Sequence, residues 1–207
     1  MTKLTILLMR HGQTDWNRAG RWQGHADIPL NETGQQQADA LCQRLHSWPI
    51  KAVYTSDLQR CVQTAVPLAT SLGLKPILTP IWRERDVGDF SGLTGKQTRE
   101  QYPEAWQNSI RGMVDPPNGE PFADVLSRAW QAYESVVDAH ENGTVAVVTH
   151  GGLLHALLSQ IMGIDRTVYG RFSMRGNTGL TIIEFDGRGP LVTLLNDTSH
   201  LETHFEV

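Results

Sequence analysis

Four residues of this chain carry side chains that proteins use to handle phosphate, and each lies where the sequence pattern predicts the end of a strand. They are Arg10, His11, Arg60 and His150. Arginine presents a planar fork of donors that matches phosphate oxygens, and a neutral imidazole nitrogen can attack phosphorus and hold it covalently. Gly12 lets the backbone turn where a side chain would crowd an anion. A lone histidine or arginine in such a place is usually structural, but the four together predict a phosphoryl site.

The strands that would position these residues are indicated by short apolar runs. Three such runs, at 5–9, 52–56 and 144–149, end beside the four side chains. Runs this apolar are typical of strands buried on both faces of a sheet. Ligands of open α/β sheets bind outside the carboxyl ends of the strands, so one crevice is expected to collect the four residues.

Helices are predicted between the strands from apolar periodicity and from end signals. Thr33 with Gln36, and Ser56 with Gln59, have capping-box spacing, and Pro67 is expected to kink or locally break the second of these helices. The other expected elements are helices at 97–109, from Phe122 to the Asn142-Gly143 pair and at 153–163, a short strand at 76–79, loops at 12–30 and 113–121, and a hairpin of 179–185 with 190–195.

The alternation of strands and helices predicts an α/β fold. We expect a three-layer α/β/α sandwich with a mostly parallel sheet and an antiparallel edge strand. The 207 residues fit one domain, and no repeat or linker divides the range 1–207.

Composition argues against several classes of function. The net charge is −4 and the 18 Lys and Arg residues form no run, so no general affinity for nucleic acid is expected. No apolar run approaches the roughly 20 residues that cross a bilayer, and the first residues lack a signal-peptide cleavage site, so we expect a cytoplasmic protein without membrane contact. Cys42 and Cys61 are expected to be free thiols, and the histidines show no metal-binding spacing.

Several motifs together resemble the histidine phosphatase superfamily, also called the phosphoglycerate mutase-like family. They occur in order along nearly the whole chain and read RHGQTDWN at 10–17, QGHADIPLNETG at 23–34, TSDLQRCVQTA at 55–65, RERDVGDFSGLT at 83–94 and VTHGG at 148–152. A single Arg-His-Gly triplet would be a weak signal. The agreement of separate motifs makes the resemblance specific.

The resemblance implies a role for each matching position. The histidine of the Arg-His-Gly motif becomes phosphorylated in this family, which falls on His11. The matching phosphate- or substrate-binding positions are Arg10, Arg60, His150, Asn17, Gln23, Gly24 and Gly151. No metal and no other cofactor is implied.

The proton donor of the family corresponds to Glu84. An alkoxide leaving group needs a proton near neutral pH, and hydrolysis of phosphohistidine needs a proton removed from water, so one carboxyl group can serve twice. Glu84 must carry a proton for the first duty, and an ion pair with Arg83 or Arg85 would oppose this.

The resemblance leaves the reaction open between hydrolysis and phosphoryl transfer within a substrate. Cofactor-dependent phosphoglycerate mutases of the family carry an insertion with an adjacent arginine pair after the catalytic glutamate. The segment between Glu84 and Glu120 is short and contains no adjacent arginine pair, Arg111 being single, and Gly152 replaces an asparagine that mutases tend to have. We therefore expect a metal-independent phosphatase that hydrolyses phosphate monoesters of small phosphorylated metabolites. A phosphoglycerate mutase is the alternative, and a non-catalytic phosphate-binding domain is disfavoured by the intact residue set.

The sequence leaves the substrate and the oligomeric state open. The aromatic residues that could line an apolar pocket, or belong to the core, are Trp16, Trp22, Trp82, Phe90 and Trp106. Pro121 stands where the family often has a serine, so any cap or substrate contact from that serine is in doubt. The closing segment LNDTSHL, residues 195–201, recurs at the end of similar chains, and its residue types indicate no role.

Overall fold

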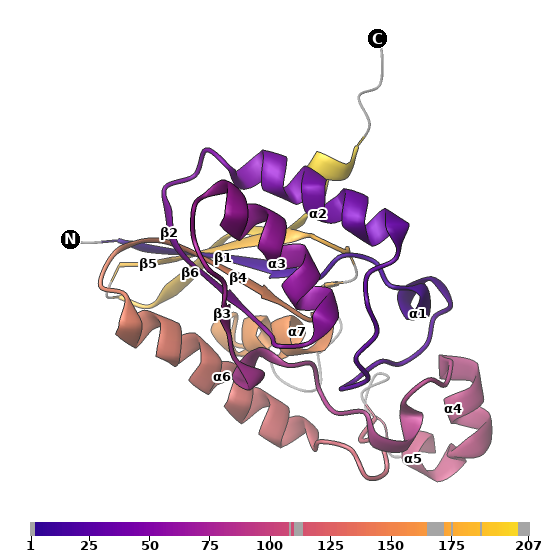
Figure 1. Ribbon diagram of the computed structural model, residues 1–207. Helices are drawn as coiled ribbons and strands as arrows, with labels where there is room; N and C mark the ends of the chain where they lie inside the picture. Colours follow the sequence, from indigo (N-terminus) through magenta and orange to yellow (C-terminus); the bar gives the residue numbers. More distant parts are fainter. Residues whose placement is uncertain are drawn as a thin grey trace.

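A six-stranded β-sheet runs through the middle of the protein (Figure 1). The computed structural model describes residues 3–107, 109, 114–164, 172–174, 176–186 and 188–202. Its strands are β1 (Leu4–Arg10), β2 (Ile50–Thr55), β3 (Ile77–Leu78), β4 (Gly143–Thr149), β5 (Leu180–Phe185) and β6 (Pro190–Asp197). The strand order is β3-β2-β4-β1-β5-β6, in which the first four strands are parallel and β5 is antiparallel to both β1 and β6. The mostly parallel sheet and the terminal hairpin are confirmed.

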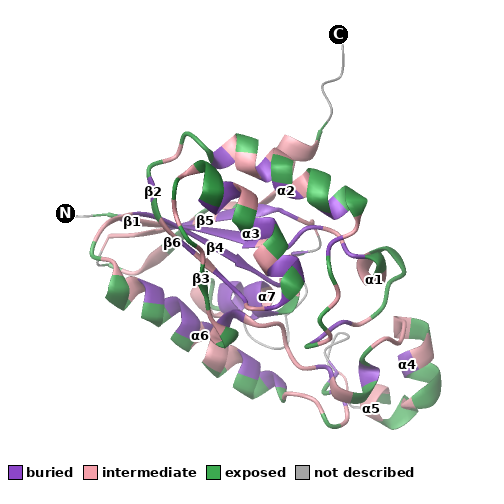
Figure 2. Cartoon of the chain, viewed as in Figure 1, coloured by how far each residue is buried: buried purple, intermediate pink, exposed green. Residues whose placement is uncertain are grey.

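Helices cover both faces of the sheet. They are α1 (Asp15–Arg18), α2 (Glu32–Leu45), α3 (Gln59–Ser71), α4 (Gly95–Gln101), α5 (Pro103–Gln107), α6 (Phe122–Ala139) and α7 (Gly151–Ile161), with 3₁₀ turns η1 (Pro80–Trp82), η2 (Gly88–Phe90) and η3 (Ser199–Leu201). α2 packs with α3 on one face, and α6 packs with α7 on the other (Figure 1). The inner sides of these helices and the central strands are buried (Figure 2). This is the expected three-layer α/β/α sandwich.

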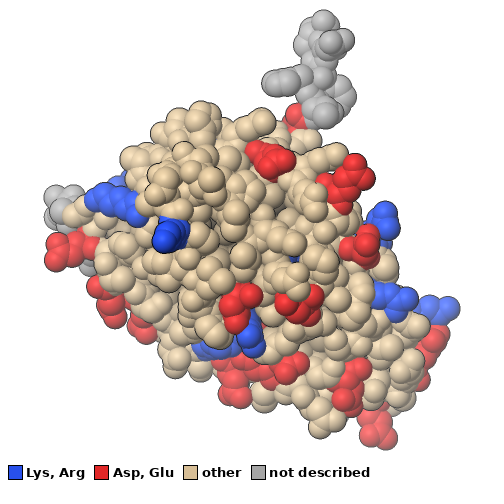
Figure 3. Space-filling view, viewed as in Figure 1, with Lys and Arg blue, Asp and Glu red and all other residues tan. Residues whose placement is uncertain are grey.

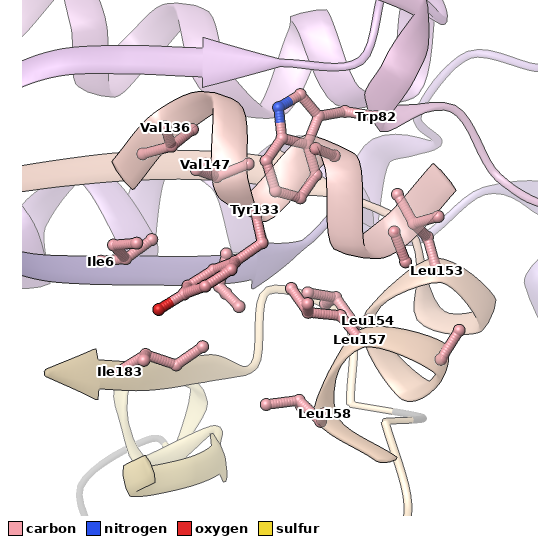
Figure 4. Packing of buried hydrophobic residues seen from close by; sticks show 14 of the residues in the cluster. Ile6, Trp82, Tyr133, Val136, Val147, Leu153, Leu154, Leu157, Leu158 and Ile183 are labelled. Carbon is pink, nitrogen blue, oxygen red and sulfur yellow. The ribbon is translucent and has the colours of Figure 1, made fainter. Parts of the chain in front are cut away.

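β1 shows why the sheet needs two helical layers. Leu7 and Met9 belong to the buried cluster under α2 and α3, whereas Ile6 and Leu8 belong to the cluster under α6 and α7. Figure 4 shows the second cluster, in which Ile6 of β1 and Tyr133 of α6 both take part. Side chains alternate between the two faces of a strand, so a strand with an unbroken apolar run such as residues 6–9 is stable only when both faces are covered.

Both predicted capping boxes are wrong. The N-cap of α2 is Asn31, whose side-chain oxygen accepts from the Gly34 amide at 2.9 Å, so Thr33 already lies inside the first turn. α3 begins at Gln59 after Leu58, which makes no side-chain cap. Spacing alone could not distinguish a cap from neighbouring polar residues of the first turn.

α3 continues through Pro67 without the expected break. Pro67 lacks the N–H of a helical hydrogen bond, which removes one bond from the helix. Ala65, Leu68 and Ala69 beside it are completely or almost completely buried, and their burial in the core holds the helix together.

Three further predictions differ from the structure, the first of them because of local backbone chemistry. The helix expected at 97–109 is two helices, since Pro103 has no N–H and Tyr102 before it leaves the helical region with φ −129° and ψ 56°. The loop expected at 12–30 contains the short helix α1. α6 ends at Ala139, before the Asn-Gly pair that was expected to end it.

Figure 3 shows how the charged groups are distributed over one face of the molecule. On the face shown in Figure 3, Lys and Arg side chains lie among Asp and Glu side chains and do not gather into one patch. Among the described residues, no helix combines the length and the apolar character needed to cross a membrane. Cys61 is buried and Cys42 half-buried, and both are free thiols as expected.

Candidate active site

The ends of β1 and β4 bring the predicted residues together. Arg10 is the last residue of β1, and the His11 amide donates to the Thr149 carbonyl at the end of β4 over 2.9 Å. His150 follows as the N-cap residue of α7, and its ring centroid lies 5.2 Å from that of His11. Arg60 enters from the first turn of α3. The crevice expected at the carboxyl edge of the sheet is therefore present.

The His11 ring is oriented as a nucleophile. Its Nδ1 lies 2.7 Å from the Gly12 carbonyl oxygen, which can only accept, so Nδ1 carries the proton and Nε2 keeps its lone pair. Burial lowers the pKa of His11 well below 6.5, and Arg10 and Arg60 lower it further. The ring is thus neutral near pH 7. Gly12 is required because a Cβ atom there would lie 2.5 Å from the Gly34 carbonyl oxygen.

Arg60 is fully buried and fixed in position by three hydrogen bonds. Nη1 donates to the Ala26 carbonyl at 2.7 Å, Nη2 to the Gly24 carbonyl at 2.8 Å, and Nε to His150 Nδ1 at 3.2 Å. Burial lowers the pKa of Arg60 from its usual value. Gly24 thus acts through its carbonyl, and its φ of +49° and the 2.6 Å that would separate a Cβ from Val87 Cγ2 both require glycine.

His150 is buried and neutral. Its Nδ1 accepts from Arg60, and its Nε2 lies 3.3 Å from the thiol of Cys61. Burial lowers the pKa of His150 well below 6.5, with Arg60 and His11 adding to the effect. His150 packs against the His11 ring but does not line the cavity itself. Its direct contact with a phosphoryl oxygen stays a prediction.

The Glu84 carboxylate lies at the N-terminus of α7. Oε2 accepts from the Gly152 amide at 3.1 Å, and Oε1 accepts from the amides of Leu153 at 3.2 Å and Arg85 at 2.9 Å. A Cβ at position 152 would lie 2.4 Å from Oε1, so this glycine makes room for the carboxylate. The predicted Gly151 does not line the cavity, and a Cβ there would lie 3.3 Å from Arg10 Nε.

The arginines around Glu84 are bound to other groups. Arg83 pairs with Asp57 through hydrogen bonds of 2.7 and 2.5 Å, which lower the pKa of that carboxyl group. Arg85 donates to the Glu120 carbonyl at 2.8 Å, among other acceptors. Neither guanidinium bonds to the Glu84 side chain among the described contacts. The ion pair that would oppose a proton on Glu84 is therefore absent from the described structure.

Asn17 and Gln23 both line the cavity with amide groups that are oriented by one hydroxyl. Thr14 Oγ1 lies 3.1 Å from Asn17 Oδ1 and 3.1 Å from Gln23 Oε1. Because the two amide oxygens lie at this hydroxyl, the two NH₂ groups stay available, and no described residue accepts from either. They can donate to an anion in the cavity.

The cavity has a volume of about 340 Å³, and its lining residues fall into two groups by their chemistry. The polar group, called here the inner wall, consists of Arg10, His11, Asn17, Gln23, Arg60, Glu84 and Gly152. The mostly apolar group, called here the outer wall, consists of Gly20, Arg21, Trp22, Arg85, Val87, Val114, Phe122 and Val125. A space of this size suits a small molecule with one strongly anionic end.

The aromatic residues named from the sequence do not all line the cavity, and Pro121 does not cap the helix that follows it. Of the five aromatic residues named from the sequence, Trp22 lines the cavity and Trp82 is buried in the core. Phe90 stacks with Trp106 in the small cluster behind Trp22, and Trp16 lies beside Gly92, where an added Cβ would be 3.2 Å from its Cη2. Pro121 provides no cap for α6. The Phe122 amide instead donates to Asp115 Oδ1 at 3.0 Å, so Asp115 supplies the missing cap.

Sequence reasoning missed three residues that complete the site. Gly152 binds Glu84, as described above. Asn177 Nδ2 donates to the His11 carbonyl at 2.9 Å, and the Thr178 amide donates to the Arg10 carbonyl at 3.0 Å. Arg111, considered from the sequence, lies outside the described residues. Within the described part of the chain, no three His, Cys, Asp or Glu side chains gather where they could hold a metal ion.

Comparison with known proteins places this chain in a family. The family model for the histidine phosphatase superfamily (branch 1) matches residues 6–198. The chain is 36% identical to phosphoglycerate mutase-like protein 4 of Arabidopsis thaliana, over 95% of this chain and 86% of that protein. It is 32% identical to phosphoserine phosphatase 1 of Hydrogenobacter thermophilus, over 95% and 93%.

A solved structure supports the same relationship. Bacillus stearothermophilus YhfR superimposes with a TM-score of 0.88 at 36% identity, covering 96% of this chain and all of that one. The resemblance stated from the motifs is confirmed. The chain belongs to the histidine phosphatase superfamily.

Proposed function

We propose that this phosphatase hydrolyses phosphate monoesters of small metabolites through a phosphoryl group carried on Nε2 of His11. The observation that carries the proposal is the state of the His11 ring, which is neutral, holds its proton on Nδ1 and faces a cavity with two arginines. A neutral imidazole nitrogen with a free lone pair is the form that attacks phosphorus.

In the first step, Nε2 of His11 forms a bond to phosphorus while the bond from phosphorus to the ester oxygen breaks. Glu84 gives its proton to that oxygen, and the alcohol leaves. Arg10 and Arg60 offset the charge on the phosphoryl oxygens, and the amide NH₂ groups of Asn17 and Gln23 donate to them. Such donors, fixed before the reaction starts, contribute most of the rate gain in phosphoryl transfer.

In the second step, water attacks the phosphorus of phosphohistidine and Glu84 takes the proton from that water. The bond from phosphorus to Nε2 breaks, inorganic phosphate leaves, and His11 returns to its neutral form. One carboxyl group therefore acts first as acid and then as base. Each role needs only the side chains of the inner wall, so the residues present supply the chemistry.

The cavity favours a small substrate with a second anionic group. Its volume of about 340 Å³ suits a metabolite, and Arg21 on the outer wall has one guanidinium nitrogen bonded to the Gly92 carbonyl. The rest of that guanidinium bonds to no described residue. A relative is named as a phosphoserine phosphatase, and phosphoserine carries such a second group. We therefore propose small acidic phosphate esters as the substrate class.

The alternative is a phosphoglycerate mutase, and one relative has a mutase-like name. A mutase must grip the second acidic end of the substrate firmly. Arg85 lies on the outer wall, but its three donor nitrogens are bonded to Glu120, Val114 and Asp115. Arg21 is then the one described outer-wall guanidinium with donors to spare, where the mutases of the family have an adjacent arginine pair. This favours hydrolysis.

We also propose a cytoplasmic location, which the free thiols of Cys42 and Cys61 support.

Two experiments test the proposal. Release of phosphate is measured over phosphoserine, phosphoglycerates, sugar phosphates, nucleotides and an aryl phosphate, with isomerisation of 3-phosphoglycerate assayed beside it. Brief mixing with a radiolabelled ester is expected to leave an acid-labile phosphoryl group on the protein, and His11→Ala is expected to abolish both labelling and turnover. Labelling that persists in this variant refutes the assignment, and isomerisation faster than phosphate release would favour the mutase.

A further inference from the structure

The closing segment, residues 195–201, lies behind the active site. No residue of this segment lines the cavity. β5 is antiparallel to β1 with Leu180 paired to Met9, so the turn before β5 reaches the end of β1, where the nucleophile begins. His200 at the centre of η3 contacts that turn. The residue types of this segment indicated no role, but its contact with the turn before β5 suggests a supporting role for that turn.

The turn at 176–179 holds the backbone of the nucleophile. Asn177 Nδ2 donates to the His11 carbonyl at 2.9 Å, and the Thr178 amide donates to the Arg10 carbonyl at 3.0 Å. Thr178 is fully buried and has a φ of +53°, a conformation that β-branched residues rarely adopt. Such a backbone is strained and persists only when its surroundings hold it.

His200 holds Thr178 by a hydrogen bond whose direction is fixed. Nδ1 of His200 lies 3.0 Å from Arg44 Nη1, and arginine can only donate, so Nδ1 accepts. The neutral ring then carries its proton on Nε2, which donates to Thr178 Oγ1 at 3.0 Å. Thr178 Oγ1 in turn donates to the Asn177 carbonyl at 2.8 Å. These bonds form a chain with one direction from Arg44 to the turn.

Arg44 and Asp197 fix His200 in this state. Arg44 Nη2 pairs with Asp197 Oδ2 at 2.5 Å, and the Ser199 amide donates to Asp197 Oδ1 at 3.0 Å. Burial and the nearby Arg44 lower the pKa of His200 to about 4, so the ring is neutral near pH 7. The chain of hydrogen bonds is therefore complete under ordinary conditions.

We propose that His200 is a positioning residue for His11, which acts by holding the strained Thr178 turn against the carbonyls of Arg10 and His11. Without this support, Thr178 relaxes and the backbone that carries the nucleophile moves with it. His200 touches neither substrate nor the reacting atoms. The proposal rests on the proposed function, because it takes His11 as the nucleophile.

The test compares two replacements of His200. His200→Phe keeps a ring of similar size and removes both nitrogens, whereas His200→Gln keeps one acceptor and one donor. The rate of phosphorylation of His11 by an aryl phosphate is measured in a single turnover. We expect about a tenfold or greater loss for His200→Phe and a rate within about threefold of the natural protein for His200→Gln, since a shift of about 1 Å in a reacting group can cost about 100-fold. Inhibition by inorganic phosphate should change by less than about threefold.

Two further variants separate positioning from general destabilisation. Leu201→Ala disturbs the same segment without breaking the chain of hydrogen bonds, and it should keep the natural rate of phosphorylation. Thr178→Gly removes both the hydroxyl group and the strain, so adding His200→Phe to it should cause no additional loss.

Four results would overturn the proposal. They are an unchanged rate in His200→Phe, an equal loss in Leu201→Ala, a folded His200→Gln that is as slow as the phenylalanine variant, and a full further loss from His200→Phe in the glycine background. Labelling of His11→Ala would instead overturn the proposed function, so the two failures are distinguishable.

Discussion

Replacing Gly152 with alanine should displace the Glu84 carboxylate while leaving the fold intact. The added Cβ would lie 2.4 Å from Oε1, and real Cβ atoms keep at least about 3.0 Å, so the carboxylate must move by about 0.6 Å, the shortfall between these two distances. The movement lengthens the hydrogen bonds from the amides of Gly152 and Leu153, now 3.1 and 3.2 Å. A reacting group displaced by this much should transfer its proton about 10- to 100-fold more slowly.

The assay is a single-turnover measurement with two substrates, an alkyl phosphate and an activated aryl phosphate. An alkoxide needs the proton from Glu84 and a good leaving group does not, so Gly152→Ala should slow the alkyl ester far more than the aryl ester. Gly95→Ala is the matched control, since Gly95 is helical and a Cβ there meets only the Arg99 side chain at 3.7 Å. An equal loss on both esters would refute the assignment of Glu84 as proton donor, and so would no loss on either.

Two predictions concern stability. Burial is the main cause of the lowered pKa values of His11 and His150. Below about pH 6.5 the unfolded chain therefore binds more protons than the folded protein. The free energy of unfolding should fall as the pH drops from there, by up to about 1.4 kcal/mol per pH unit for each histidine. When urea denaturation is measured between about pH 7.5 and 5, the free energy of unfolding should fall less steeply with decreasing pH in His11→Ala than in the unsubstituted protein. Equal pH dependence in the two proteins would contradict the reasoning. Asp115→Ala removes the cap of α6 and should lower the free energy of unfolding by about 1 kcal/mol. Glu134→Ala, on the exposed side of the same helix, is the control and should change the free energy of unfolding little. Equal effects of the two substitutions would argue against the cap.

The strand ends could be predicted from the sequence because three apolar runs each stop at a polar group. Burial of a sheet on both faces leaves a strong pattern, and parallel strands must end at the same edge. Arg10, His11 and His150 follow directly from that geometry. Arg60 follows too, since it stands in the first turn after such a run.

The remaining residues of the site could not be predicted from the sequence, because contacts with segments distant along the chain position them. Gly152 matters only through the approach of Glu84, and Thr178 only through the chain that reaches it from His200. The position of Thr178 depends on the pairing of β5 with β1. A hairpin predicted from sequence does not indicate which strand of the sheet it pairs with. At the start of α2, Asn31 and Thr33 are both good caps, and local spacing cannot choose between them.

The two walls of the cavity have different origins, and this has a consequence for how such an enzyme can change. Of the inner wall, Arg10, His11, Arg60 and Gly152 lie at strand ends and helix starts that the core holds rigid, whereas much of the outer wall comes from connecting segments that tolerate substitution. Selectivity can therefore drift without rebuilding the reaction. An engineer seeking a new substrate would vary Val87, Val114 and Arg21, and would leave the carboxyl edge of the sheet untouched.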